Sequence, residues 1–326
     1  MPFQSKKTSV VQNELMVLQM ENVSLAGKKI LIAGGSGFIG GHLCHELIKL
    51  GCEVWVLSRN SRRAIKKLGA GIRVVEQLDG LVGIEFFALV NLAGEPLGAG
   101  RWNHSLKLRF RQSRVDFTNR LYQFFLAQEQ FPEVVINASA IGVYGSRGSE
   151  CLTESSAVGE GFAAELCRDW EAAAQQFASR SVRLCLVRIG IVLDADGGAL
   201  RQMLPAFKMG LGGRMGSGDQ YMSWIHREDL VRLFVYLLAH SQAVGVFNGV
   251  APMPVPNNLF TSTLASCLGR SALLPMPAFV LRLLFGEMAD ALLLSSQRVV
   301  PRNAEQQGFE YLYPSLAEAL KKILKK

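Results

Sequence analysis

An apolar run that ends in three spaced glycines constrains this chain more than any other feature. Residues 30–41 read Ile-Leu-Ile-Ala-Gly-Gly-Ser-Gly-Phe-Ile-Gly-Gly, and leucines at helical spacing follow. Gly34 lets the chain turn off a strand, Gly37 allows a pyrophosphate to come close, and Gly40 lets a helix pack on a sheet. A second strand-like run follows at 53–57. The complete unit therefore predicts a dinucleotide site rather than an ordinary tight turn.

Strand-like and helix-like segments alternate through the first two-thirds of the chain. The strand candidates are 29–33, 53–57, 72–75, 88–92, 133–139 and 182–189, and the helix candidates are 38–50, 61–68, 103–129 and 162–179. This alternation predicts an α/β fold with a doubly wound parallel sheet of the Rossmann type. Ligands of such sheets lie at the carboxyl ends of the strands, so the loops there are the candidate functional segments.

The alternation of strand-like and helix-like segments ends near residue 195. The glycine-rich segment 210–218 lacks the Lys-Ser/Thr pair of a nucleotide P-loop, so we interpret it as a mobile substrate loop. We expect a helix at 228–240, a strand at 245–249, and then helical segments at 257–268, 277–295 and 315–325. The predicted organisation is an N-terminal extension at 1–27, a dinucleotide-binding Rossmann domain at 28–194 and 226–250, and a smaller, mainly helical substrate lobe at 195–225 and 251–326.

Composition narrows the class of protein. No apolar stretch reaches the length of about 18 residues that a spanning helix needs, so we expect no membrane span. The six cysteines and five histidines show no ligand spacing, so we expect no metal site and free thiols in a reducing compartment. That favours a cytoplasmic protein, with organellar import left open. The net charge of +8 is compatible with nucleic acid, but without a nucleic-acid motif we favour a solvated tail and arginines that serve an anionic ligand.

The end of the second strand discriminates between cofactors. An enzyme that uses NAD usually carries Asp or Glu there, whereas this chain has Ser58 and Arg59. An acidic group would repel a 2′-phosphate, and serine and arginine bind one. We therefore predict NADP(H); the alternative is an ordinary polar turn before an exposed helix.

Two further segments complete the predicted cofactor site. Small residues after the fourth strand let the backbone lie along the cofactor, with Glu95 near the nicotinamide. Lys107, Arg111 and Arg114 share one face of the following helix, which either attracts an anion or is simply solvated. Arg114 is the best candidate for inward contact, and we assign Arg111 to the substrate. The predicted cofactor-binding residues are Gly34, Ser36, Gly37, Phe38, Ile39, Gly40, Ser58, Arg59, Leu92, Ala93, Gly94, Glu95 and Arg114.

The motifs together resemble a known family. The matching segments include residues 34–40, 91–95, 101–102, 112–114, 139–145, 167–171, 187–193, 224–230, 247–252 and 296–301. Through them the chain resembles an atypical extended short-chain dehydrogenase/reductase of the nucleotide-sugar epimerase sort, in the group called "epimerase family protein". The resemblance implies a Rossmann domain, NADP(H) and a C-terminal substrate lobe. It also implies a link to cell or organelle division, because some relatives carry a "cell division inhibitor" label and relatives in plastids have been linked to organelle division.

One departure from that superfamily affects the chemistry. Its active members use a Ser, a Tyr and a Lys four residues after the Tyr. Here the resemblance places Ala163 at the Tyr position and Cys167 at the Lys position, and Ala140 at the Ser position with Ser139 before it. The candidate catalytic substitutes are Ser139, Tyr144 and Cys167, with Glu95 and His226 also considered. His226 is assigned to the substrate; a helix-capping role is its alternative.

Two functional hypotheses follow from these residues. The first is an NADP(H)-dependent oxidoreductase or epimerase-like enzyme acting on a small, sugar-derived or anionic substrate. The second is an NADP(H)-binding protein that has lost turnover and serves as a sensor or interaction partner. The intact loops around the predicted pocket favour the first, and the missing Tyr and Lys favour the second. The sequence leaves the substrate, the proton donor and the oligomeric state open.

Overall fold

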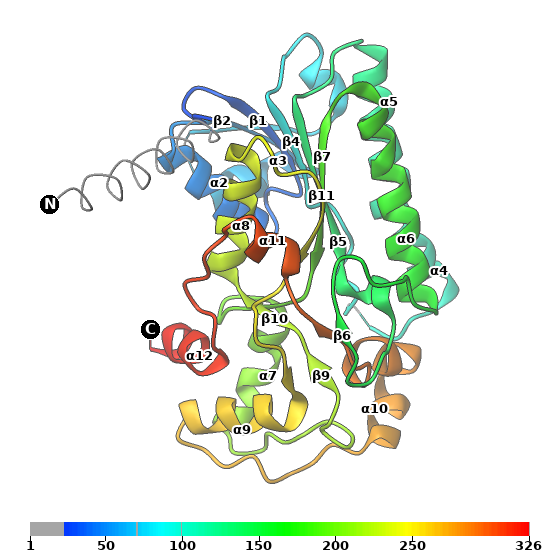
Figure 1. The fold of residues 1–326 in the computed structure, drawn as a ribbon, viewed down its shortest axis with the longest axis vertical. Helices are drawn as coiled ribbons and strands as arrows, with labels where there is room; N and C mark the ends of the chain where they lie inside the picture. The colour runs from blue at the N-terminus through cyan, green and yellow to red at the C-terminus, as the bar shows by residue number, and fades with distance from the viewer. Residues whose placement is uncertain (1–22, 70, 99, 326) are drawn as a thin grey trace, which may run out of the picture.

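A seven-stranded parallel sheet forms the centre of the protein (Figure 1). The computed structural model describes residues 23–69, 71–98 and 100–325; most of the predicted N-terminal extension, residues 1–22, lies outside them. The strand order is β11-β7-β5-β4-β1-β2-β3, and every pairing in it is parallel. The strands are β1 (Lys29–Ala33), β2 (Glu53–Leu57), β3 (Ile72–Val75), β4 (Ala88–Asn91), β5 (Val134–Ala140), β7 (Arg183–Ile189) and β11 (Gly245–Gly249). The predicted doubly wound α/β fold is confirmed.

Helices cover both faces of this sheet. On one face α2 (Gly40–Lys49) packs against α8 (Arg227–Ala239), and on the other α5 (Phe117–Ala127) packs against α6 (Phe162–Gln175) (Figure 1). Each pair closes its own apolar core against the strands. The central strands are buried on both sides for this reason, which explains why they read as unbroken apolar runs instead of alternating ones.

The long helix predicted at 103–129 is interrupted. It consists of α4 (His104–Arg111), a π-helical turn (Gln112–Asp116) and α5. A π turn accommodates an extra residue and changes which side chains face inward, and such turns are frequent at functional sites. The prediction of one continuous helix was therefore wrong in this detail, and the interrupted stretch contains Ser113 and Arg114.

The last third of the chain forms a second cluster of helices around its own core. Its helices are α7 (Gly198–Lys208), α9 (Asn257–Cys267) and α12 (Leu316–Leu324). The neighbouring α10 (Ala278–Phe285) contributes Phe285 to a separate cluster with Trp102 and Phe110. We did not predict α7, whose apolar pattern is short and contains Pro205. The helix predicted at 277–295 breaks after α10, because Gly286 adopts a φ of +59°.

Further helices and short strands complete the fold. They are α3 (Ser61–Leu68), α11 (Arg302–Gln306), β6 (Cys151–Leu152), β8 (Ile191–Leu193), β9 (Tyr221–Met222), β10 (Trp224–His226), β12 (Val255–Pro256) and β13 (Arg298–Val299). The short strands were not predicted, since two or three residues carry no periodic signal. Ala304 and Phe309 belong to the core beneath the sheet. The domain boundaries given above stay a prediction.

Within the described residues, no helix is both long and apolar enough to cross a membrane. The same residues contain no group of three or more His, Cys, Asp or Glu side chains that could hold a metal ion.

Candidate functional site

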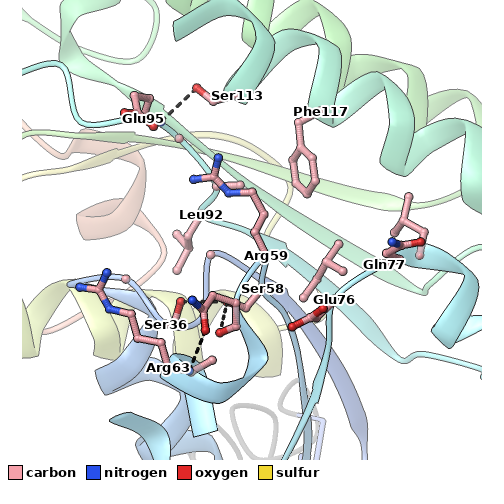
Figure 2. A pocket seen from close by; sticks show the side chains of 18 of the residues that line it. Ser36, Ser58, Arg59, Arg63, Glu76, Gln77, Leu92, Glu95, Ser113 and Phe117 are labelled. Atoms are coloured by element: carbon pink, nitrogen blue, oxygen red, sulfur yellow. Dashed lines mark hydrogen bonds between the residues drawn. The ribbon is translucent and has the colours of Figure 1, made fainter. Parts of the chain in front are cut away.

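A cavity of about 890 Å³ opens at the carboxyl ends of β1, β2, β3 and β4 (Figure 2). This is the edge at which doubly wound sheets bind their ligands. The predicted residues that line it are Gly34, Ser36, Gly37, Ser58, Arg59, Leu92, Ala93, Gly94 and Glu95. Others that line it are Arg63, Lys67, Glu76, Gln77, Leu78, Asp79, Ser113, Phe117 and Arg120, among further residues.

The glycine-rich turn has the geometry of a phosphate cradle. A Cβ on Gly34 would lie 2.7 Å from the backbone of Leu92, and one on Gly40 would lie 2.4 Å from the Gly34 carbonyl oxygen. The backbone N–H groups of Phe38 and Ile39 donate no hydrogen bond within the described part of the chain. Free N–H groups at the start of a helix are the donors that a pyrophosphate uses. The residues present therefore fit a dinucleotide.

Two contacts hold this turn in place. From α3, Lys67 Nζ donates to the carbonyl oxygens of Ser36 at 2.7 Å and Gly37 at 3.1 Å. On the other side, the Phe38 ring packs against Gly197, and the Arg227 guanidinium lies 5.1 Å from the ring centre. Of the predicted residues, Phe38 and Ile39 do not line the cavity with their side chains, because both pack away from it.

The end of β2 gives the cavity a cationic wall. Arg59 extends into the cavity from the loop after β2 (Figure 2), and the Ser36 and Ser58 hydroxyls lie 3.4 Å apart. Arg63 and Lys67 continue this wall along α3. Sequence reasoning missed these two residues, although they follow Arg59 at successive intervals of four residues, which was a usable signal.

The segment after β4 forms the opposite wall. Leu92, Ala93, Gly94 and Glu95 all line the cavity, and the Glu95 backbone N–H donates to Ser113 Oγ at 3.0 Å (Figure 2). Arg114 does not line the cavity itself. Its guanidinium lies behind Gly94, where a Cβ would approach it to 3.0 Å.

Two of the three predicted catalytic residues lie together beyond β4. Ser139, at the end of β5, donates its hydroxyl to Glu171 Oε1 at 2.6 Å. The Cys167 thiol lies beside it and is buried, which raises the pKa of the thiol to about 11. Both Cys167 and Ala163 lie close to Gly142. The structure therefore gathers these residues but holds Cys167 as a neutral thiol at neutral pH.

A buried network of hydrogen bonds links Tyr144 to that group through Arg188 and Glu171. It is fully buried, donates to Asn248 Oδ1 at 2.7 Å and accepts from Arg188 at 3.0 Å. Burial raises the pKa of the phenol above its usual value. Arg188 in turn binds both oxygens of Glu171 at 2.8 Å. This arrangement fits a structural role for Tyr144. The catalytic assignments of Ser139, Tyr144 and Cys167 stay predictions.

The two predicted substrate residues lie outside the main cavity. Arg111 pairs with Asp169 at 2.7 Å. His226 Nδ1 accepts a hydrogen bond from the Glu228 N–H and so caps α8, which is the alternative role given for it above. Burial lowers the pKa of its imidazole. His226 lines a separate cleft of about 710 Å³ between α2, α8 and α12. Substrate roles for both residues remain predictions.

The fold and the cradle define a dinucleotide-binding protein of the Rossmann type. Residues 30–248 match the model of the NAD dependent epimerase/dehydratase family, and residues 276–323 match a domain of unknown function (DUF1731). The chain belongs to the NAD-dependent epimerase/dehydratase family, and the relatives it matches are named epimerase family proteins.

Two relatives and two solved structures illustrate this similarity. The chain is 37% identical over 302 residues to "Epimerase family protein SDR39U1 homolog, chloroplastic" of Arabidopsis thaliana, covering 90% of this chain and 86% of that one. An epimerase family protein of Mycobacterium leprae is 36% identical over 292 residues, covering 89% and 94%. The crystal structure of human epimerase family protein SDR39U1 with NADPH has a TM-score of 0.83 at 34% identity, covering 91% and 99%. A nucleoside-diphosphate sugar epimerase from Corynebacterium glutamicum has a TM-score of 0.73 at 30% identity, covering 98% of this chain and 63% of that one.

Proposed function

We propose that the protein is an NADP(H)-dependent oxidoreductase or epimerase-like enzyme acting on a small molecule. The observation that carries the cofactor preference is the cationic wall formed by Arg59, Arg63 and Lys67. A 2′-phosphate at the end of β2 would meet these charges and the hydroxyls of Ser36 and Ser58. The human relative solved with NADPH supports the same preference.

Glu76, an acidic residue near the cationic wall, does not favour NAD. It follows β3, and hydrogen bonds from Ser61 lower the pKa of its carboxylate, first from the side chain and then from the backbone N–H at 2.9 Å. It stands at the end of β3, whereas the carboxylate that selects NAD follows the second strand. The position after β2 is Ser58-Arg59.

A fluorescence titration with NADPH and NADH tests this proposal. We expect NADPH to bind at least tenfold tighter than NADH, because only NADPH carries the 2′-phosphate. Arg59→Gln and Arg63→Gln should weaken the binding of NADPH, while the affinity for NADH should stay within twofold of that of the unmodified protein. Arg62→Gln is the matched control, since Arg62 is exposed on the same helix and does not line the cavity. Equal affinities for the two cofactors in the unmodified protein would overturn the preference.

A catalytically degenerate NADP(H)-binding sensor or interaction protein is the second candidate. Ala163 and Cys167 occupy the positions of the usual Tyr and Lys, Tyr144 is bonded within the buried network, and Glu171 is neutralised by Arg188. Incubating the NADPH complex with a panel of carbonyl compounds and sugar nucleotides separates the two functions. Oxidation of NADPH by at least one of these compounds supports the enzyme. If none of them oxidises NADPH, the result supports the sensor or interaction protein.

We also propose a cytoplasmic location. All six cysteines are unpaired, as expected in a reducing compartment. The Arabidopsis relative is named as chloroplastic, so an organellar form is the competing outcome when the native protein is located by cell fractionation.

A further inference from the structure

Arg114 is a partly buried cation without an acidic partner. The arginines with less than a tenth of the side chain exposed, Arg188 and Arg227, each bind a carboxylate at 2.8 and 2.7 Å. Among the described residues, no carboxylate lies within 4 Å of Arg114, and its one hydrogen bond is to Ser113 Oγ at 3.4 Å. The guanidinium lies instead 5.2 Å from the ring centre of Trp170. A desolvated charge in this setting is stabilised by an anionic ligand.

The backbone is shaped to hold Arg114 directly behind Gly94, a residue of the cavity wall, although Arg114 does not itself line the cavity. It lies in the π-helical turn between α4 and α5, and its neighbour Ser113 lines the cavity. Gly94 leaves room for the guanidinium, because a Cβ there would come within 3.0 Å of it. A π turn and a glycine from two separate segments thus converge on one side chain.

The position of Arg114 corresponds to the reaction end of the cofactor site. The cationic wall that suits a 2′-phosphate follows β2, and the glycine turn follows β1. A dinucleotide that starts there continues across β4 toward β5, where Ser139 and Cys167 lie. Burial lowers the pKa of Arg114, and the nearby Cys167 and Glu95 act in the opposite direction, so the guanidinium lies between the end of β4 and α6.

The number of cations on this helix face that are free to bind a ligand indicates which kind of anion fits there. Lys107 and Arg111, the other cations of the predicted helix face, are paired with Glu287 at 2.6 Å and Asp169 at 2.7 Å. Arg114 is therefore the cation of that face left to bind a ligand. A single guanidinium binds a carboxylate through two parallel hydrogen bonds, whereas a nucleoside diphosphate carries more charge than one arginine offsets.

We propose that Arg114 binds the carboxylate of a small oxo acid or hydroxy acid beside the position of hydride transfer. This rests on the proposed NADP(H)-dependent function. In the reductive direction a carbonyl carbon of the substrate gains hydride from NADPH, and its oxygen gains a proton from water. The products are NADP⁺ and the hydroxy acid. Arg114 orients the substrate and keeps its own protons, because a guanidinium stays charged at neutral pH.

Calorimetry on the NADP⁺-loaded protein tests this role with oxamate and its neutral amide, oxamide. We expect oxamate to bind at least tenfold tighter than oxamide, Arg114→Met to abolish that difference, and Arg114→Lys to keep part of it. NADPH affinity should stay within twofold. Arg109→Met is the control, since Arg109 is exposed on α4 and does not line the cavity.

Other outcomes overturn the proposal in distinguishable ways. Equal binding of oxamate and oxamide to the unmodified protein refutes a carboxylate site. A tenfold loss of NADPH affinity in Arg114→Met, with the oxamate preference intact, assigns Arg114 to the cofactor. If Arg114→Met does not fold, Gly94→Ala displaces the guanidinium while keeping its charge, and unchanged oxamate affinity would then refute the role. Failure of the proposed function is seen separately, as absent NADPH binding in the unmodified protein.

Discussion

The contact between Phe38 and Gly197 makes a steric prediction about cofactor binding. A Cβ on Gly197 would lie 2.4 Å from Cδ2 and 2.6 Å from Cε2 of the Phe38 ring. Gly197 has a φ of −170°, which alanine adopts freely, so the effect of Gly197→Ala is purely steric. Gly198 and the Arg227 guanidinium also lie against this ring. Overpacking of this kind costs about 1–3 kcal/mol.

Displacement of the Phe38 ring should also shift the backbone N–H groups that we expect to bind the pyrophosphate. The backbone of Phe38 carries one of the free N–H groups of the glycine turn, and moving its ring moves the donor. If the whole overpacking energy of about 1–3 kcal/mol is lost from NADPH binding through the distorted glycine turn, NADPH affinity drops by about 5- to 150-fold, since about 1.4 kcal/mol is a factor of ten. The ligand 2′-AMP lacks a pyrophosphate and should lose less than twofold.

Fluorescence titration with NADPH and calorimetry with 2′-AMP measure these two affinities. Gly98→Ala is the matched control, because a Cβ there meets nothing within 4 Å. Loss of thermal stability in Gly197→Ala with NADPH affinity unchanged would refute the reasoning, because the ring would then have moved without the turn. Equal losses for both ligands would mean a general disturbance of the cavity and would also contradict it.

Three further predictions concern the buried groups around β5 and α6. Glu171→Gln leaves the Arg188 charge unpaired and should lower the free energy of unfolding in urea by about 3–5 kcal/mol, whereas Glu150→Gln at the surface pair with Arg147 should cost under about 1 kcal/mol. Tyr144→Phe should cost about 1–3 kcal/mol while turnover persists; complete loss of turnover in a folded variant would instead support Tyr144 as catalytic. The pKa of Cys167 is raised from 9.0 to about 11, so the unfolded thiol ionises first and stability falls as pH rises from 9 to 11. Cys167→Ala should reduce the loss of stability between pH 9 and 11, whereas Cys151→Ala at the surface should leave it unchanged. The check is the free energy of unfolding from denaturation curves over this pH range, and the same pH dependence in Cys167→Ala and the unmodified protein would contradict the prediction.

The glycine-rich turn after β1 and the cationic wall after β2 could be predicted in large part because their determinants are local in sequence. Gly34, Gly37 and Gly40 act through backbone geometry within one turn, and Arg59 follows directly on a strand. Lys67 also lay within reach of this reasoning, since it continues a four-residue spacing that begins at Arg59. Arg227 did not, because nothing in the sequence indicates that it packs on Phe38, which is far away along the chain.

The reaction end shows why the remainder resisted prediction. Glu171 and Arg188 come from α6 and β7, and their pairing with Ser139 depends on how three elements pack. The π turn that carries Arg114 has no clear sequence signature, so a continuous helix was the natural expectation. The resemblance places Ala163 and Cys167 at the usual Tyr and Lys positions, so the cation that the usual Lys supplies has to come from another position. Arg114 is the candidate that we propose, which makes the oxamate comparison the experiment that most directly separates an altered active site from a lost one.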